Sequence, residues 1–281
     1  MDLTHIAYQD AATRSYLGSP SLARLPDDFP HGGEIVATHD YFGPGCALNH
    51  EEEEHLSAVY RSSDCGRSWR RVTLIAGAFW SNLFVHRGAL YLLGCSQQYG
   101  SIVIRRSDDG GDTWTHPGDA SRGLLFEGGP RREPPNYHCA PMPVLEVQAA
   151  TQWRGTGPRP GQQRRLYRAF EDCDPCVWGS GFRSAIISAE ADADLLNAES
   201  WRMSNRLPFD PAWAPEEWNA ECPGWLEGNV VQAPDGRLVN ILRVNSTPAC
   251  DRAAMVEVSA DGTEVAFDPA DGFITLPGGM T

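Results

Sequence analysis

One nine-residue motif occurs twice in the chain and constrains its fold more than any other feature. The copies read Arg61-Ser-Ser-Asp-Cys-Gly-Arg-Ser-Trp69 and Arg106-Ser-Asp-Asp-Gly-Gly-Asp-Thr-Trp114, so they share R-S-x-D-x-G-x-[ST]-W and start 45 residues apart. Each copy follows a β-prone run, at 56–60 and 101–104, and precedes a polar turn. A repeat of this length is typical of one β-propeller blade made of four short strands.

The residue types of the motif suit a structural turn. Ser and Asp side chains can bond to backbone amides across a tight turn, and Gly adopts a conformation that other residues resist. The Trp can pack beneath the hairpin. We therefore expect the motif to stabilise a strand–turn–strand unit and to take no part in chemistry.

Weaker copies of the motif extend the repeat. Segment 188–201 resembles the motif, with a short helical insertion in place of its turn. Segment 258–263 keeps only the Ser, Asp and Gly of the motif. Asp235-Gly236, between two β-prone runs, predicts a hairpin, and the composition of 154–163 predicts an exposed loop. The predicted blades are 17–75, 76–120, 136–206 and 222–270. Their predicted inner strands are 21–25, 35–39, 83–85, 89–94, 142–147, 166–170, 229–232 and 238–244.

The sequence thus predicts an all-β fold, with residues 1–281 forming a single β-propeller domain. About four blades do not close a ring of the usual size, and an open edge invites aggregation. We expect an incomplete six-bladed ring that lacks its C-terminal blades. A small, closed five-bladed ring is the alternative.

Charge and hydropathy narrow the class of partner. The formal net charge of −14 disfavours nucleic acids and anionic lipid surfaces. The sequence contains no run of about 18 apolar residues, so it predicts no membrane span.

No signal peptide is visible, so the expected compartment is the cytoplasm, where the eight cysteines would be mostly reduced. Cys173 and Cys176 have the spacing of a metal knuckle but no second pair at a usual distance, so we expect a disulfide or free thiols there and no metal. We also expect no cofactor and a monomer.

Several segments resemble the sialidase-like superfamily of β-propellers, also known by its BNR repeats or Asp boxes. They are the two motifs, Leu25-Pro26-Asp27, His138-Cys-Ala-Pro141 and Leu226-Glu-Gly-Asn229, and the resemblance covers nearly the whole chain. Sialidases are exo-glycosidases that bind a sugar carboxylate with three Arg, and they use a Tyr nucleophile activated by a Glu, with an Asp as acid/base. The resemblance places Glu227 at the activating Glu and Arg243 at one of the three Arg. Segment 16–20, where the first Arg is expected, contains none.

The ends of the predicted inner strands supply the other candidate catalytic residues, because ligands bind where these strands converge. Asp40 follows such a strand, and it could equally cap a turn. Glu171 and Asp172 end another strand and face opposite sides, so only one points inward and we favour Glu171. His138 opens the blade that carries Glu171; His39 and His86 also lie near strand ends, where a lone His is more often structural. The predicted catalytic residues are Asp40, Glu171, Glu227 and His138.

Two sets of residues could bind substrate. Arg105, Arg168, Arg183 and Arg243 lie in or beside strands and would form a carboxylate clamp if they converge. Ordinary salt bridges to the many acidic residues are the alternative. Trp80 and Trp225 could stack on a sugar ring, whereas Trp69, Trp114 and Trp201 belong to the motif turns.

The resulting hypothesis is an exo-glycosidase of the sialidase type that removes a terminal acidic sugar, sialic or uronic acid, from a glycan. One alternative is a polysaccharide lyase that uses His and Tyr beside a uronate. Another is a propeller that binds glycans without catalysis. Two carboxyl groups about 5–10 Å apart would support hydrolysis, and a His–Tyr pair beside clustered Arg would support elimination.

Overall fold

The computed structural model describes residues 3–45, 56–130, 133–148, 164–216, 218, 223–246 and 251–277. The predicted loop at 154–163 and cysteines 46, 222 and 250 lie outside these ranges. The chain divides into two compact units: unit 1 comprises Met1–Arg132 with Leu196–Ala198, and unit 2 comprises Glu133–Leu195 with Glu199–Thr281. A single propeller domain over 1–281 stays a prediction. No described helix is long and apolar enough to cross a membrane.

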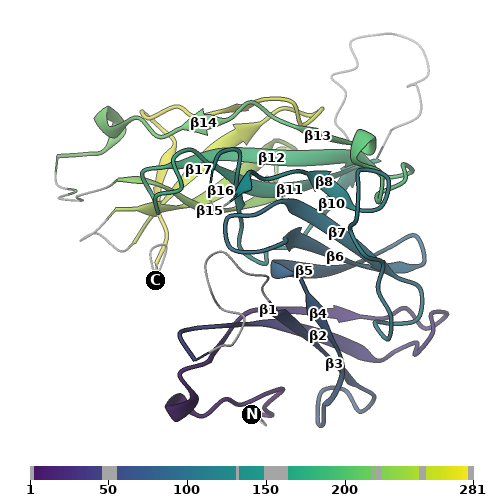
Figure 1. Ribbon diagram of the computed structural model, residues 1–281. Coiled ribbons are helices and arrows are strands. Elements are labelled where there is room, and N and C mark those ends of the chain that lie inside the picture. The colour runs from purple at the N-terminus through teal and green to yellow at the C-terminus, as the bar shows by residue number, and fades with distance from the viewer. Residues whose placement is uncertain are drawn as a thin grey trace, which may run out of the picture. The chain divides into compact units, whose positions relative to one another are not determined.

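Unit 1 contains two antiparallel sheets whose strands follow one another in chain order (Figure 1). The first is β1 (Tyr16–Arg24), β2 (Ile35–Phe42), β3 (Leu56–Ser62) and β4 (Arg70–Ala76), preceded by the short helix η1 (Ala11–Thr13). The second is β5 (Phe79–His86), β6 (Ala89–Cys95), β7 (Ile102–Ser107) and β8 (Leu124–Phe126). Strand β5 lies against β1 and β2, and an apolar core fills the space between the sheets.

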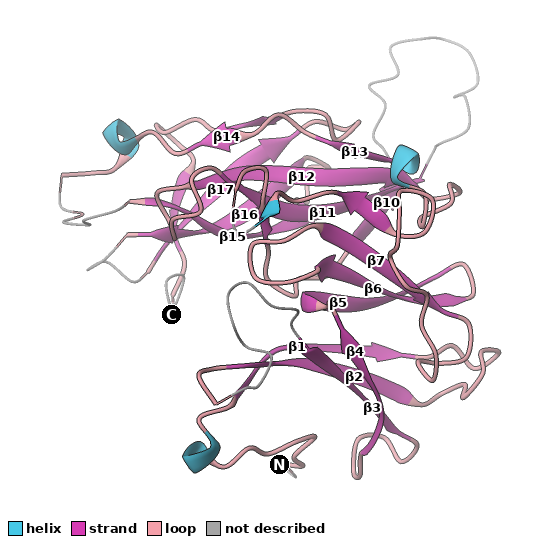
Figure 2. Cartoon of the chain, viewed as in Figure 1, coloured by secondary structure: helices cyan, strands magenta, loops and turns pink. Residues whose placement is uncertain are grey.

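Unit 2 also contains two antiparallel sheets (Figure 2). The first comprises β9 (Tyr137–His138), β10 (Leu145–Gln148), β11 (Arg164–Cys173), β12 (Phe182–Glu190), β13 (Trp201–Met203) and β14 (Leu207–Pro208). The second comprises β15 (Gly224–Gln232), β16 (Leu238–Asn245), β17 (Arg252–Val258), β18 (Val265–Ala266) and β19 (Phe273–Thr275). Short helices η3 (Ala198–Ser200) and η4 (Pro211–Trp213) lie in the connections. Strand β15 packs on β11 and β12.

These four sheets confirm the predicted all-β fold, and they overlap the four predicted blades. The structure differs at the start of the third blade, where a strand was expected over 142–147. There β9 and β10 pair separately with the two ends of β11. Pro141 and Pro143 lie between them, and proline has no amide hydrogen to donate to a ladder, which accounts for the break. The number of blades in a closed ring stays a prediction.

The two motif turns have the same hydrogen bonds, which confirms their structural role. In the second copy, Ser107 Oγ accepts from the Gly111 amide at 2.8 Å, and Asp109 Oδ1 accepts from the Thr113 amide at 2.9 Å. Trp114 Nε1 donates to the Gly111 carbonyl at 3.1 Å. Gly111 has φ +95°, which favours glycine. The equivalent bonds of the first copy join Ser62, Asp64, Gly66, Ser68 and Trp69.

Three first strands carry a β-bulge near their N-terminal ends. The register shifts between Gly18 and Ser21 in β1, between Phe79 and Asn82 in β5, and between Trp225 and Gly228 in β15. Bulges turn side chains out of the regular alternation and are frequent beside active sites. These three bulges contain Ser19, Trp80 and Glu227, each of which contributes to a cluster described below.

Candidate active site

In unit 2, a histidine and a buried glutamate lie side by side on paired strands. His138 on β9 is the register partner of Glu171 on β11, and Nδ1 of the imidazole lies 2.9 Å from Oε2 of the carboxyl group. The ring of Phe182 packs on the imidazole with ring centres 4.7 Å apart. Glu171 has no exposed surface and His138 is 3% exposed. The pair is therefore enclosed within the unit.

Glu227 brings a second carboxyl group to the same imidazole. It lies in the β15 bulge, where its Oε1 is 4.0 Å from Nε2 of His138. Its other oxygen, Oε2, accepts from Nη1 of Arg243 at 3.0 Å. The side chain of Glu227 is 21% exposed and that of Arg243 is 31% exposed. The two ring nitrogens of His138 thus face two carboxyl groups, of which Glu227 is the one that solvent reaches.

The surroundings of Glu171 favour its protonated form. Burial is the main cause that raises the pKa of this carboxyl group, and the negative charge of Glu227 adds to it. The hydrogen bond from His138 acts in the opposite direction. The amide of Gly228, directly after Glu227, donates to Oε1 of Glu171 at 3.0 Å. Glu171 and Glu227 are thus neighbours with different environments.

The neighbouring residues Tyr137 and Asp172 face the other side of the sheet. Asp172, 1% exposed, accepts from Arg183 at 2.9 Å and also contacts Arg206. Tyr137 shares a hydrogen bond with Arg206, and burial raises the pKa of its hydroxyl. Tyr137 and His138 therefore take part in different clusters.

Unit 1 also holds a buried carboxyl group, that of Asp40 on β2. It is 2% exposed, and Oδ2 accepts from the amide of Trp80 at 2.6 Å. Oδ1 contacts the hydroxyl of Ser57, and the Ser19 side chain gives a further hydrogen bond. Burial raises the pKa of Asp40 to about 7. The group is therefore able to exchange a proton near neutral pH.

The other histidines near strand ends in unit 1 lie in aromatic surroundings. His39 stacks on Tyr60, and its Nε2 is 3.3 Å from the Tyr60 hydroxyl. Burial lowers the pKa of His39. His86 is 6% exposed and lies beside Tyr91. The structure thus gives both histidines packing partners.

The four predicted substrate arginines are in different surroundings. Arg105 donates to the backbone carbonyls of Ala76 and Gly77 at 2.8 and 3.0 Å. Arg168 is fully buried and donates to the carbonyls of Ala140 and Ala169. Arg183 pairs with Asp172, as described above. Of the four, Arg243 is the one that bonds a predicted catalytic carboxylate, and a clamp formed by all four stays a prediction.

The two predicted stacking tryptophans also differ. Trp225 is fully buried, and its ring packs within an aromatic cluster that includes Phe209, Trp213 and Phe267. A ring enclosed in this way has no face open to a sugar, so the expectation for Trp225 was wrong. Trp80 is partly exposed and meets Tyr99 edge to face at 6.1 Å. Trp80 therefore stays a candidate.

Sequence reasoning missed Arg206, Ser57 and the amide of Gly228. Arg206 follows a short strand in an irregular segment, and no motif marks it. Ser57 is the second residue of the predicted β-run at 56–60, where its residue type carries no signal. A backbone amide that reaches a side chain on another sheet depends on tertiary packing and leaves no mark in the sequence.

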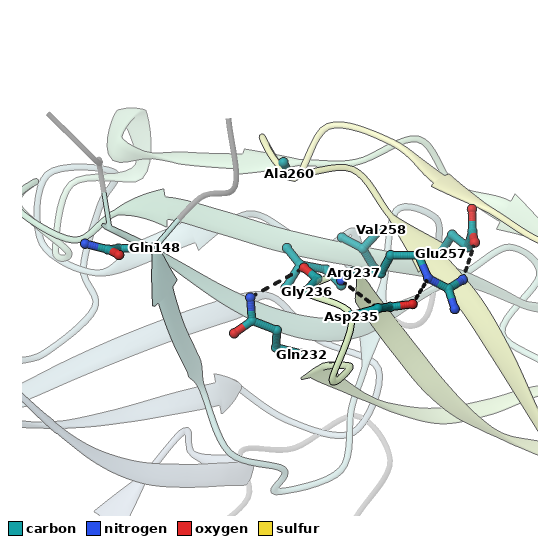
Figure 3. A pocket seen from close by; sticks show the side chains of 9 residues that line it. Gln148, Gln232, Asp235, Gly236, Arg237, Glu257, Val258 and Ala260 are labelled. Atoms are coloured by element: carbon teal, nitrogen blue, oxygen red, sulfur yellow. Dashed lines mark hydrogen bonds and ion pairs between the residues drawn. The ribbon is translucent and has the colours of Figure 1, made fainter. Parts of the chain in front are cut away.

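Unit 2 contains a cavity of about 360 Å³ beside the hairpin between β15 and β16 (Figure 3). It is lined by the hairpin around Asp235 and Gly236, with Gln148 and Glu257. Arg237 in this cavity is bound to Asp235 and Glu257 at 2.7 and 2.8 Å. The hairpin joins the end of β15 to the start of β16, whereas Glu227 lies near the opposite end of β15. No group of His, Cys, Asp and Glu in the described ranges could hold a metal ion.

Comparison with known proteins identifies the fold. The sequence matches no family model and no curated protein. Among solved structures, an α-L-arabinanase from Penicillium chrysogenum aligns with a TM-score of 0.50 and 16% identity over 90% of this chain and 65% of its own. A xylan β-1,4-xylosidase from Bacillus halodurans aligns with a TM-score of 0.52 and 9% identity over 92% of this chain and 44% of its own. Both are sialidase-like β-propellers. This chain has the sialidase-like β-propeller fold.

A protein of unknown function from Dyadobacter fermentans shares this sialidase-like fold, with a TM-score of 0.54 and 15% identity over 96% of this chain and 71% of its own. The chain spans 65% of the arabinanase and 44% of the xylosidase. The resemblance found in the sequence is confirmed for the fold. At these identities the likeness carries no activity from one propeller to another.

Proposed function

We propose that this sialidase-like propeller is a glycoside hydrolase in which Glu227 contacts the substrate and exchanges a proton with it. One observation carries the proposal: the imidazole of His138 lies between a buried carboxyl group, Glu171, and a partly exposed one, Glu227. Glycosidases divide their chemistry between two carboxyl groups whose environments differ. The cluster in unit 2 has this character.

The contacts suggest a separate role for each group. Both oxygens of Glu171 already have partners, Gly228 and His138, and the side chain is fully buried. Glu171 would therefore act through His138, by fixing the ring and holding a proton. Glu227 would take a proton from Nε2 of His138 and give it to the glycosidic oxygen as the bond to the leaving sugar breaks. A water molecule would bond to the anomeric carbon in place of that sugar, and the proton it loses would return to His138 through Glu227.

Two observations favour this activity over its alternatives. Within the cluster of unit 2, elimination beside a uronate would need a His and a Tyr on the same side, whereas the consecutive residues Tyr137 and His138 face opposite sides of β9. Glycan binding alone would not require the buried carboxyl group of Glu171. Such a group costs stability, and ionisable residues with shifted pKa values concentrate at catalytic sites.

A terminal acidic sugar is the more specific proposal for the substrate. Arg243 lies beside Glu227 and is 31% exposed. A guanidinium has five N–H donors, so Arg243 could hold Glu227 and a sugar carboxylate together. Neutral pentose units are the competing substrates, because an arabinanase and a xylosidase share the fold.

Product analysis tests the activity and the substrate together. The protein would be incubated with arabino- and xylo-oligosaccharides, sialyllactose and a glucuronate-capped oligosaccharide. We expect release of a free reducing sugar, with the acidic substrates preferred. A product with the ultraviolet absorbance of a conjugated uronate would identify a lyase instead, and binding without turnover would leave a glycan-binding protein.

A further inference from the structure

Trp80 in unit 1 has a backbone conformation that bulky residues rarely adopt. Its φ is +50°, in the left-handed region, and it lies in the β5 bulge between Phe79 and Asn82. A bulky residue with this φ is an outlier, and such strain persists only where the surroundings enforce it. Strained residues of this kind concentrate at ligand-binding sites.

A buried carboxyl group on the neighbouring sheet holds the strained residue. Oδ2 of Asp40 on β2 accepts from the amide of Trp80 at 2.6 Å. The ring of Trp80 packs on Phe79 with ring centres 4.7 Å apart and meets the edge of Tyr99 at 6.1 Å. Tyr99 is 5% exposed, whereas Trp80 keeps part of its surface exposed. The indole is thus supported by protein and partly open to solvent.

The hydrogen bonds around Asp40 are satisfied when it carries a proton. The hydroxyl of Ser57 has one hydrogen, but Oγ contacts both Oδ1 of Asp40 and, at 2.8 Å, the carbonyl of Ala78. With Asp40 ionised, one hydrogen serves two acceptors. With Asp40 protonated, the carboxyl group donates to Ser57 and Ser57 donates to Ala78, so each acceptor is served.

Neutral groups surround the Asp40 carboxyl in the described part of unit 1. They are Ser19 from β1, Ser57 from β3 and the Trp80 amide from β5. His39 and Tyr41, next to Asp40 on β2, lie against each other on the opposite face. No charged group contributes to the shift, and burial raises the pKa of Asp40 to about 7.

We propose that Asp40 is a positioning residue which fixes Trp80 as a platform for the face of a sugar ring. The proposal rests on the proposed function in that its ligand is a glycan. A sugar presents an apolar face of C–H groups, for which a partly exposed indole is a suitable surface. The carboxyl group of Asp40 binds both the Trp80 amide and Ser57, so replacing it by a methyl group should free the indole and weaken glycan binding.

The first experiment follows Trp80 itself and needs no ligand. The full chain is labelled with 5-fluorotryptophan, and the ¹⁹F signal of Trp80 is assigned with Trp80→Phe. In the unchanged protein the signal moves with pH, with a midpoint near the Asp40 pKa of about 7. In Asp40→Asn, whose amide makes the bonds of the protonated acid, the signal stays at its low-pH position. The exposed Trp178 of unit 2, assigned in the same way, is the control. A Trp80 signal that does not titrate, or that titrates equally in Asp40→Asn, overturns the proposal.

The second experiment measures affinity by calorimetry for xylotetraose, arabinotetraose and sialyllactose. Trp80→Ala and Asp40→Ala weaken binding about tenfold at low pH, the scale of one aromatic contact, and Asp40→Asn does not. Equal affinity in Trp80→Ala, or no binding of any of the three sugars, overturns the platform. Glu227→Gln separates the two proposals. If it still cleaves glycans while Trp80→Ala has lost affinity, the proposed catalytic role fails and the platform stands.

Discussion

The amide of Gly228 donates to Oε1 of Glu171 across 3.0 Å, from a β-bulge in one sheet to a buried carboxyl group in the sheet before it. The amide of Trp80 bears the same relation to Asp40 in unit 1. In both units the carboxyl group lies on the second strand of its sheet, and burial raises its pKa. The same arrangement therefore occurs in both units. A backbone amide in the bulged first strand of a sheet donates to a buried carboxyl group of the preceding sheet.

Replacing Glu171 tests whether it acts through His138. Glu171→Gln keeps an oxygen for the Gly228 amide and removes the ionisable group beside the imidazole. We expect kcat to fall at least about tenfold and the pH–rate profile to change, because proton transfer by a positioned group contributes about 10²–10⁴-fold. Steady-state kinetics across pH would measure both effects. Glu257→Gln, at an exposed ion pair of the same unit, is the matched control. An unchanged pH–rate profile in Glu171→Gln would leave Glu171 with a structural role alone.

Asp40 makes folding stability depend on pH. Its pKa is raised from the usual 3.8 to about 7 in the folded protein, so the folded state keeps the proton where the unfolded state has lost it. The contribution of Asp40 to the free energy of unfolding is therefore full below about pH 4 and is lost as the pH rises to about 7. At about 1.4 kcal/mol per pH unit, the loss is on the order of 4 kcal/mol.

Asp40→Asn removes this dependence. We expect the variant to gain stability relative to the unchanged protein over the same pH range, as measured by urea unfolding at several pH values. In Asp28→Asn, at an exposed position, the free energy of unfolding should change with pH as it does in the unchanged protein. If the free energy of unfolding of Asp40→Asn showed the same pH dependence as that of the unchanged protein, Asp40 would not hold a proton in the folded state.

The motif turns should affect stability and leave chemistry unchanged. Ser107→Ala removes the acceptor of the buried Gly111 amide, and an unpaired buried group of this kind costs about 1–3 kcal/mol. We expect that loss in urea unfolding, with kcat of the folded protein unaltered. Ser63→Ala, at an exposed variable position of the first motif, should change neither quantity. A fall in kcat with unchanged stability would contradict the structural role.

Thiol labelling tests the expected reduced state of the cysteines. Cys65 is exposed, while Cys95, Cys139 and Cys173 are buried, and none of these four forms a disulfide in the structure. Burial also raises the pKa of the Cys173 thiol, which disfavours the reactive thiolate. We expect iodoacetamide to modify Cys65 first and the three buried thiols only on unfolding, as read by peptide mass spectrometry. A disulfide-linked peptide containing Cys173 and Cys176 would contradict this.

The sequence predicted those features that depend on local interactions. The bonds of Asp109 with Ser107 and Thr113 close within one turn, so the residue pattern alone indicated the turn and the blade around it. The break between β9 and β10 could also have been read from Pro141 and Pro143. In contrast, the partners of Arg105 and Arg168 are backbone carbonyls brought close by folding. No residue pattern distinguishes such an arginine from one that binds a ligand.

The candidate site was predicted as separate residues, and their relation came from the fold. Sequence placed His138 and Glu171 in one blade and Glu227 at a strand start, but the position of His138 between the two carboxyl groups depends on register and on a bulge. Trp225 was misjudged because an aromatic residue beside a site looks the same in the sequence whether it is buried or exposed.

The rate of sugar release by Glu227→Gln, compared with the unchanged protein on the substrate found by product analysis, is the decisive measurement. The substitution keeps the shape of the side chain and removes its ability to exchange a proton. Circular dichroism and glycan affinity would show that the fold and binding are retained. We expect kcat to fall by about 10²–10⁴-fold with little change in affinity. A kcat within a few-fold of the unchanged protein would contradict a catalytic role for Glu227 and with it the proposed active site.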